Sequence, residues 1–406
     1  MLLKIIALAI AGLSGAAFAQ SNVTISGTIG ASYDSYSLSG ATTARTTYNQ
    51  NMVSDQSTAV ILKGEEALGG GMKAWFQIDS RLTMDRGNGG VNNYSTGIQT
   101  SGVGNGNTAI GVSGNFGTVG VGRWDLHYDA LAGIENLAIA PALAARFGHF
   151  GVMANVNGTQ IAVGSRSANV MFYESPSFSG FKGRLSYSTN AYGGEGEAAL
   201  GAANGNPGNG SSTNLKLNYD NGPLNVVYSY WNHKVEDRNN YTAGWAIAAT
   251  GISNTPTATA APNAADQLSN RLGVAYTFPM GVKVGLAWDR STVKSNAATG
   301  DMTRTAWMLP VSYTTGAHMF AFNYAKAGKT SGAAAGADDN AASQYLLGYA
   351  YALSKRTTVG VQYMAMTNKT NGAYSLAGAS SANTGLTAAT AGEDGKLTTF
   401  NIRHNF

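Results

Sequence analysis

Apolar and polar residues alternate with a period of two along most of this chain. Between residues 22 and 34, aliphatic, aromatic and glycine residues at odd positions alternate mostly with hydroxyl residues at even positions. The last run does the same, with Phe400, Ile402 and Phe406 on one face. In the middle, two alternating runs flank Asn221 and Gly222, a strong hairpin signal. This period is typical of strands whose two faces meet different environments.

The spacing of the alternating runs carries more information than any single run. After every even-numbered run the connection is only a few residues, whereas most odd-numbered runs are followed by long segments. Short turns at one end, long loops at the other and an even number of strands are typical of outer-membrane barrels. We count sixteen runs, at residues 22–35, 57–67, 71–83, 106–114, 117–124, 166–175, 179–189, 212–220, 223–235, 268–279, 281–294, 302–314, 317–327, 342–353, 357–368 and 394–406.

We therefore predict an all-β fold: a 16-stranded antiparallel transmembrane β-barrel in which the first and last strands pair and leave no sheet edge. In lipid every backbone polar group needs a partner within the protein, and a closed barrel supplies it. Aromatic residues near strand ends, such as Tyr33 and Tyr313, suit the girdles at the two membrane interfaces. The alternative is a soluble sandwich or propeller, which the asymmetry of turns and loops disfavours.

The first nineteen residues read as a cleaved signal peptide. Lys4 is the only charge, Ile5 to Leu13 is apolar, and Ala17-Phe18-Ala19 fits a cleavage signal. We expect residues 1–19 to be removed and residues 20–406 to form one barrel domain. Without cysteine the exported chain has no disulfides to stabilise it. Only 12% charged residues, 53 glycines and 20 tyrosines suit strands that face two different solvents.

One interval lacks the alternation. It runs over roughly forty residues, about 125–165, and loops of this length in compact domains usually have a function. Its middle, from Leu137 to Ala145, is apolar and small, whereas Asp125, Asp129 and Glu135 are its only acids. We expect such a segment to pack against another part of the protein.

Other kinds of chemistry find little support. A net charge of +4 without a basic cluster does not indicate nucleic acid. His127 near Asp125 and Asp129 is the one catalytic constellation, and no nucleophile motif accompanies it. No pair of histidines has the spacing of metal ligands. We therefore expect neither enzyme activity nor a cofactor.

Five segments, in order along the chain, are specific in combination: GEEALGGGMKAWFQ (64–77), GNFGTVGVGR (114–123), YESPSFSGF (173–181), YALSKRTTVG (351–360) and NIRHNF (401–406). Together they resemble segments of the Gram-negative general porins, especially those of beta-proteobacteria. The resemblance covers essentially the whole mature chain. It implies an outer-membrane homotrimer in which each protomer encloses a water-filled pore. The aromatic residue at the end, Phe406, is the one that the barrel-assembly machinery reads in such proteins.

The resemblance also implies a site. In this family the third long loop folds into the barrel and narrows the pore, with wall bases facing loop acids. By position in the matching motifs, the wall bases are Lys63, Arg123 and Arg166. The loop acids are Asp129 and Glu135. The chain departs from the family pattern at Ala59, where a wall base is common, and at Ile139, where a second acid is expected.

Opposite charges across a narrow opening create a transverse field, which orders dipolar solutes while small ions pass. The alternative is that Arg123 and Arg166 only pair with Asp125 or Asp129 and fix the loop. We expect either arginine to be removable with little loss of stability, because an ion pair in water contributes under about 1 kcal/mol.

Three residues share the inward parity of Gln77. Trp75 is unusual there, and we expect a shifted register or contact with the infolded loop. Asp79 and Arg81 are interpreted as a solvated pair near the end of the strand.

The remaining inward positions are mainly Thr, Ser, Asn, Gln and Gly, which favours passive passage of small hydrophilic solutes and ions over a dedicated sugar or organic-anion channel. With one expected acid missing and a positive net charge, a weak anion preference is expected.

Overall fold

The computed structural model describes most of the alternating runs. The described residues are 22–40, 47–56, 58–82, 103–127, 148–157, 159–162, 166–189, 191, 210–235, 266–294, 301–332, 336, 339–376 and 389–406. Among them, no helix is long and apolar enough to cross a membrane.

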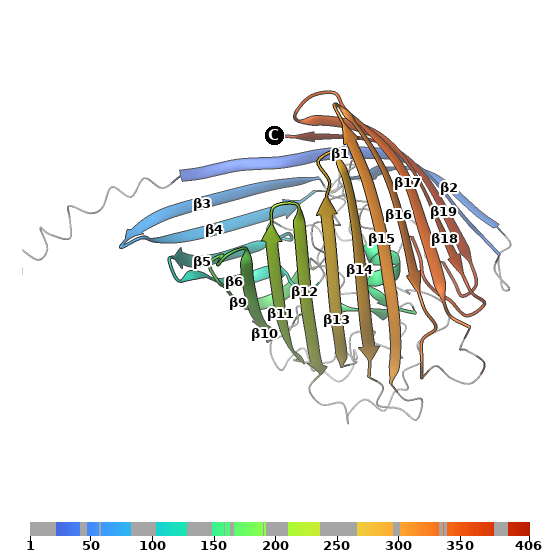
Figure 1. Ribbon diagram of the computed structural model, residues 1–406, viewed down its shortest axis with the longest axis horizontal. Helices are drawn as coiled ribbons and strands as arrows, with labels where there is room; N and C mark the ends of the chain where they lie inside the picture. Colours follow the sequence, from blue (N-terminus) through green and yellow to red (C-terminus); the bar gives the residue numbers. More distant parts are fainter. Residues whose placement is uncertain are drawn as a thin grey trace, which may run out of the picture.

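Nearly all of the described chain is β-strand (Figure 1). The strands of the large sheet are β1 (Asn22–Ser39), β2 (Thr47–Asp55), β3 (Ala59–Gly69), β4 (Met72–Arg81), β5 (Thr108–Gly114), β6 (Gly117–Asp125), β9 (Arg166–Glu174), β10 (Phe181–Ser188), β11 (Gly210–Asn221), β12 (Leu224–Val235), β13 (Gln267–Thr277), β14 (Val282–Val293), β15 (Met302–Thr315), β16 (His318–Ala327), β17 (Ala342–Ala352), β18 (Thr357–Asn368) and β19 (Asp394–Asn405).

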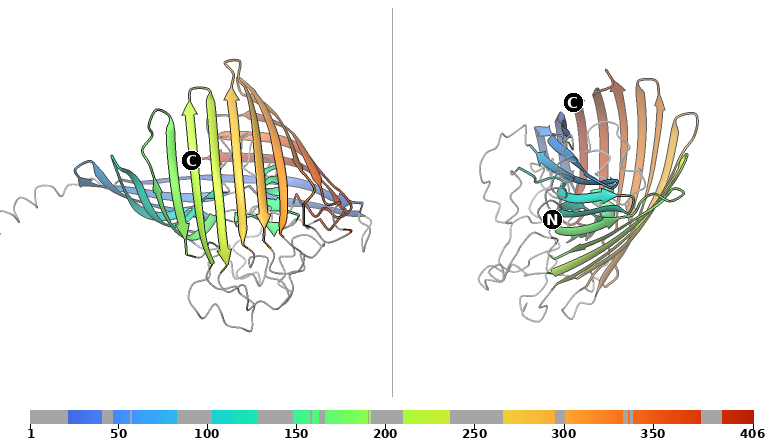
Figure 2. Two further views of the ribbon diagram at one scale, coloured as in Figure 1. Left: turned by 60° about the horizontal axis from the view of Figure 1, so that its bottom comes forward. Right: turned by 90° about the vertical axis from the view of Figure 1, so that its left-hand side faces the viewer.

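These strands close into an antiparallel barrel, as the alternation predicts. β2 and β3 both pair with β1, each later strand pairs with its neighbour in sequence, β6 pairs with β9, and β1 pairs with β19 to complete the ring. Figure 1 shows β1 beside β19, and Figure 2 shows the tight turns of successive hairpins at one end of the barrel. The barrel has sixteen strands, because β2 and β3 together form the second one.

The first two strands extend further than predicted. The sequence placed a loop at 36–56, but β1 continues to Ser39 and β2 pairs with it from Thr47 to Asp55. One extra residue between β2 and β3 shifts the register opposite β1, so the second strand contains a β-bulge. The backbone N–H of Gln56 still donates to the carbonyl of Gly30 at this break.

The two faces of the barrel differ as a membrane wall requires. The outer face exposes large apolar side chains, including Ile25 at 63% and Phe400 at 57%. Tyr33, Tyr313 and Phe406 are also exposed there, in line with the predicted aromatic girdles. The inner face buries hydroxyl, amide and charged side chains along the same strands.

The short turns meet their conformational requirements with glycine. Gly222, between β11 and β12, has a φ of 55°, in the left-handed region that other residues rarely adopt. This turn follows the Asn-Gly hairpin signal of the sequence.

Candidate functional site

The described part of the segment between β6 and β9 lies inside the barrel. It comprises a helical turn, η2 (Gly148–Met153), and two short strands, β7 (Asn155–Val156) and β8 (Thr159–Gln160). Val152 and Met153 are fully buried and pack with inward residues of the wall, including Met308. Figure 1 shows this turn within the ring of strands. Leu137 to Ala145, which were expected to pack against another part of the protein, lie outside the described residues.

A buried ionic cluster fixes this segment to the wall. Nε of Arg271 on β13 and Nη1 of Arg304 on β15 lie 2.8 and 3.0 Å from the two carboxylate oxygens of Asp289 on β14. The same two guanidinium groups donate to the backbone carbonyl of Met153, at 3.1 and 3.0 Å. The three charged side chains are at most 1% exposed. They therefore join three adjacent wall strands to the infolded segment.

The alternation and the hairpin register could have predicted the pairing of Arg271 with Asp289. Arg271 and Asp289 both fall on the inward parity of their strands, and they are direct cross-strand partners. A hairpin register drawn from the short turn after β13 would have placed them opposite each other. Their contact with Met153 could not have been found, because it depends on the path of the infolded segment.

His127 is a second contact between the segment and the wall. It follows β6 and is 1% exposed, with Nδ1 2.8 Å from Oγ of Ser229 and Nε2 2.8 Å from Oγ of Ser269. Burial, together with the nearby charge of Arg271, lowers the pKa of His127 well below its ordinary value of 6.5. The ring is therefore neutral at physiological pH, and it acts as a structural contact between two wall serines.

The buried neutral ring predicts a pH dependence of stability. Because the pKa of His127 is lowered in the folded state, only the unfolded chain takes up this proton as the pH falls below 6.5. This group's contribution is fully present above that pH, and it decreases by up to about 1.4 kcal/mol for each pH unit below it. We expect His127→Gln to flatten the decline in the free energy of unfolding between neutral pH and about pH 5.5.

The check is the slope of unfolding free energy against pH, measured by urea titration in detergent for both proteins. His318→Gln provides the control, because His318 is exposed on the outer side of β16. Equal slopes in the wild type and His127→Gln would contradict a neutral, buried ring.

Two of the predicted site residues come together. Nη2 of Arg166 on β9 lies 3.7 Å from Oδ2 of Asp125 at the end of β6, and the guanidinium of Arg123 is within electrostatic range of both. Arg184 on β10 donates from Nη2 to the backbone carbonyl of Asp125 at 2.9 Å. Sequence reasoning missed Arg184, although it has the inward parity of β10.

Arg166 is only 3% exposed. The premise that this arginine lies in water is therefore wrong. Its removal leaves the buried carboxylate of Asp125 without this cation, so little loss of stability is no longer expected for Arg166→Ala.

Lys63, the third predicted wall base, lies apart from Arg123 and Arg166. Lys63 on β3 lies opposite Gln77 on β4, and Gln77 lies opposite Ala109 on β5. Ala109 in turn lies opposite Gly122 on β6, the residue before Arg123. Lys63 therefore lies three strands from Arg123, about 14 Å at the usual strand spacing. Asp129, Glu135 and Ile139 lie outside the described residues, so the loop acids stay a prediction.

Asp79 and Arg81 form the ion pair that the sequence indicated, with Nη2 of Arg81 2.6 Å from Oδ2 of Asp79. The sequence-based expectation that this pair is solvated is wrong, because Asp79 is only 1% exposed. The backbone N–H of Asn107 also donates to Oδ2 of Asp79, at 3.3 Å. Asp79 therefore connects β4 to the start of β5.

Trp75 belongs to an aromatic cluster on the inner wall. Its ring centroid is 6.0 Å from that of Trp124 and 6.2 Å from that of Phe172, and the latter two are 5.4 Å apart. The cluster packs on a larger buried group that includes Trp231 and Val156. This explains the indole at an inward position, and it adds aromatic rings to inner-wall positions that were expected to be mainly Thr, Ser, Asn, Gln and Gly.

Glycines make room for these rings. A Cβ on Gly120 would lie 2.5 Å from Cζ of Phe172 and 2.9 Å from Cζ2 of Trp75. We expect Gly120→Ala to displace the rings and lower the free energy of unfolding by about 1–3 kcal/mol. Gly183→Ala is the matched control, because its Cβ would meet only ordinary contacts, the nearest at 3.5 Å. Equal urea midpoints for the two variants would show that the rings are not packed as described.

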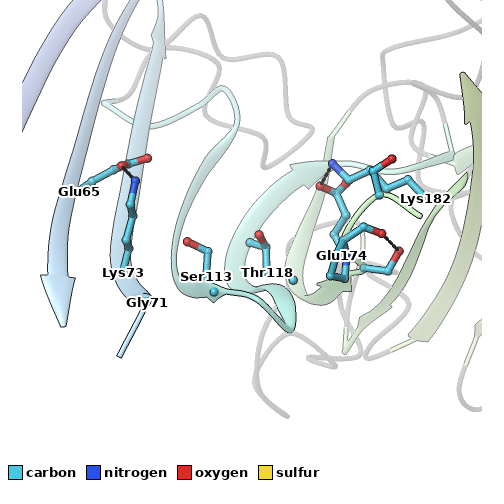
Figure 3. Close-up of a pocket in the computed structure, with 12 residues that line it drawn as sticks. Glu65, Gly71, Lys73, Ser113, Thr118, Glu174 and Lys182 are labelled. Carbon is cyan, nitrogen blue, oxygen red and sulfur yellow. Dashed lines mark hydrogen bonds and ion pairs between the residues drawn. The ribbon is translucent and has the colours of Figure 1, made fainter. Parts of the chain in front are cut away.

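Two lysine–glutamate pairs lie on the inner wall near the short turns. Lys73 is 2.9 Å from Glu65, and Lys182 is 2.5 Å from Glu174. They line a cavity of about 420 Å³, and Figure 3 shows them on either side of Ser113 and Thr118. All four charged side chains are substantially exposed, so each pair adds little to stability.

Comparison with known proteins gives consistent matches over most of the chain. A family model described as Gram-negative porin matches residues 6–371. Outer membrane porin protein 32 of Delftia acidovorans is 27% identical over 365 residues, which cover 88% of this chain and 87% of that protein. An outer membrane porin protein of Bordetella pertussis is 28% identical over 295 residues, 70% of this chain and 67% of that protein.

Solved structures agree in fold. The anion-selective porin from Comamonas acidovorans aligns with a TM-score of 0.64 at 24% identity, over 95% of this chain and 100% of that chain. The trimer form of OmpT from Vibrio cholerae aligns with a TM-score of 0.63 at 14% identity, over 95% of this chain and 99% of that chain. At these identities the likeness concerns the barrel fold.

Proposed function

The chain belongs to the Gram-negative porin family, and on that basis we propose a weakly anion-preferring diffusion pore for small hydrophilic solutes and ions. As an outer membrane porin it provides a passive route, for which neither a cofactor nor an energy source is needed. The preference for anions, the narrowing of the pore and the assembly state are the specific parts of the proposal.

The proposed preference for anions rests on the excess of positive charge on the inner wall between β3 and β10. The described residues between β3 and β10 include seven cations and four acids on or beside the inner wall: Lys63, Lys73, Arg81, Arg123, Arg166, Lys182 and Arg184 against Glu65, Asp79, Asp125 and Glu174. Even with Asp129 and Glu135 counted against it, the wall stays positive. Unbalanced charge of one sign along a low-dielectric passage concentrates ions of the opposite sign.

The narrowest part of the pore is proposed to lie between the infolded segment and the wall that carries Arg123 and Arg166. The contacts of Met153 and His127 with β12, β13 and β15 support this, because they hold the segment to the other side of the barrel. Asp129 and Glu135 are proposed to face the arginines.

We further propose that the protein is a homotrimer in outer-membrane lipid, inserted by the barrel-assembly machinery through Phe406 after loss of residues 1–19. The trimer form of the Vibrio cholerae protein supports the assembly state by analogy of fold. Exposed apolar side chains on the outer face supply the surface that lipid and neighbouring protomers would cover.

Single-channel recording in planar bilayers tests this function. The purified protein should insert with discrete conductance steps, in groups of three equal levels for a trimer. Neutral polymers of increasing size should cease to lower the conductance once they no longer enter the pore. Membranes without steps would contradict a pore, and single isolated levels would contradict the trimer.

A further inference from the structure

A second cavity lies on the same wall as the lysine–glutamate pairs, further from the short turns. It has a volume of about 240 Å³, and it shares Glu65, Thr118 and Glu174 with the cavity near the short turns. Its floor is formed by Trp75, Trp124 and Phe172. Pockets for drug-sized ligands occupy about 300–1,000 Å³, so this one has the size for a molecule with a single ring.

Lys63 supplies an uncompensated cation at this cavity. Its side chain is exposed on the inner face, and it forms no hydrogen bond or ion pair with any residue that the structure describes. The two acids in the lining are already engaged, Glu65 by Lys73 and Glu174 by Lys182. The cavity therefore has one positive charge beyond those pairs.

The aromatic floor favours a flat ring. The three rings are inclined to one another, at 69° between Trp75 and Trp124 and 33° between Trp124 and Phe172, so they do not form parallel plates along the pore. Inclined rings give a guest both edges and faces to contact. Nε1 of Trp75 is buried, and it has no acceptor in the described part of the chain.

We propose that this cavity binds small aromatic carboxylates, with the ring on the aromatic floor and the carboxylate on Nζ of Lys63. This rests on the proposed function, because inner-wall residues line the cavity and such solutes would bind there temporarily on their way through the pore. A neutral sugar gains nothing from the unpaired cation, and an aromatic cation is repelled by it. An aliphatic carboxylate gains the charge but loses the contacts specific to an aromatic ring.

Benzoate is the probe, compared with cyclohexanecarboxylate, acetate, benzylammonium and glucose. In planar bilayers, we expect benzoate to reduce the chloride current at about a tenfold lower concentration than cyclohexanecarboxylate. Acetate, benzylammonium and glucose should have weaker effects still. Equal potency of benzoate and cyclohexanecarboxylate would overturn the role of the aromatic floor, and a stronger effect of glucose would indicate a sugar site instead.

Lys63→Met and Trp124→Leu locate the effect. Each should raise the half-blocking concentration of benzoate about tenfold. The matched controls are Lys355→Met, in the turn after β17, and Trp307→Leu, on the outer face of β15, which should leave it unchanged. If benzoate blocks Lys63→Met at the same concentration as the wild type, the proposed site is wrong. The Lys63→Met variant is expected to fold, because the side chain of Lys63 is exposed.

Calorimetric titration of benzoate into the detergent-solubilised barrel separates this inference from the pore itself. Heat of binding that Lys63→Met abolishes supports the cavity even if no channel is seen. A conducting pore without such heat and without benzoate block would overturn the cavity while leaving the diffusion function intact.

Discussion

Replacing Asp289 with alanine is expected to lower the free energy of unfolding by about 3–5 kcal/mol. The carboxylate is 0% exposed and is the shared partner of Arg271 and Arg304. Without it, two buried guanidinium groups lose the carboxylate that they share, and they repel each other. The same change should loosen the infolded segment, because Asp289 contacts both of the arginines that donate to the carbonyl of Met153. Larger and noisier single-channel currents are therefore expected together with lower stability.

Urea unfolding in detergent, followed by the heat-dependent mobility of the barrel on gels, measures the first effect. Glu174→Ala is the matched control, because it also removes one acid from an ion pair on the inner wall, but from an exposed one. That change should cost under about 1 kcal/mol. Similar losses for the two variants, or a quiet channel in Asp289→Ala, would contradict the view that the buried cluster holds the segment.

Reversing the charge of Lys63 is expected to have the largest effect on ion preference. Lys63→Glu changes the inner wall by two charges at an exposed position, so the barrel should remain stable. The ratio of chloride to potassium permeability should fall about two- to fivefold, because the local excess of cations is what attracts anions. The measurement is the reversal potential in a potassium chloride gradient.

Lys355→Glu is the control for this change. It alters the net charge of the chain equally, but in an exposed turn between β17 and β18. Screening at physiological salt confines the influence of such a charge to about 8 Å. If Lys355→Glu shifted the reversal potential as much as Lys63→Glu, the selectivity would arise from overall charge and not from the wall.

The sequence predicted the barrel well because lipid and the inner wall impose opposite demands on alternate residues. The second strand was predicted too short, because its first part, β2, lacks this alternation. In β2, one face mixes Tyr48 and Met52 with Gln50, and the other mixes Val53 with asparagines, so neither face is consistently apolar or polar and no period stands out. At 18 residues β1 is also longer than the 9–11 needed to cross the bilayer, and its extension pairs with β2.

The site was only partly predictable. Resemblance to a family pointed to Arg123 and Arg166, and the structure places them together with Asp125. Alternation put Arg271 and Asp289 on the inner face, but burial and partners follow from how an irregular segment packs inside the barrel. No periodic pattern encodes that path. The aromatic floor was likewise visible only as the unexplained position of Trp75, since its partners come from β6 and β9.

The reversal potential of the wild-type protein in a potassium chloride gradient tests the account most directly. The positive inner wall between β3 and β10 predicts a potential displaced toward that of chloride. A potential displaced toward that of potassium would contradict the proposed role of this wall.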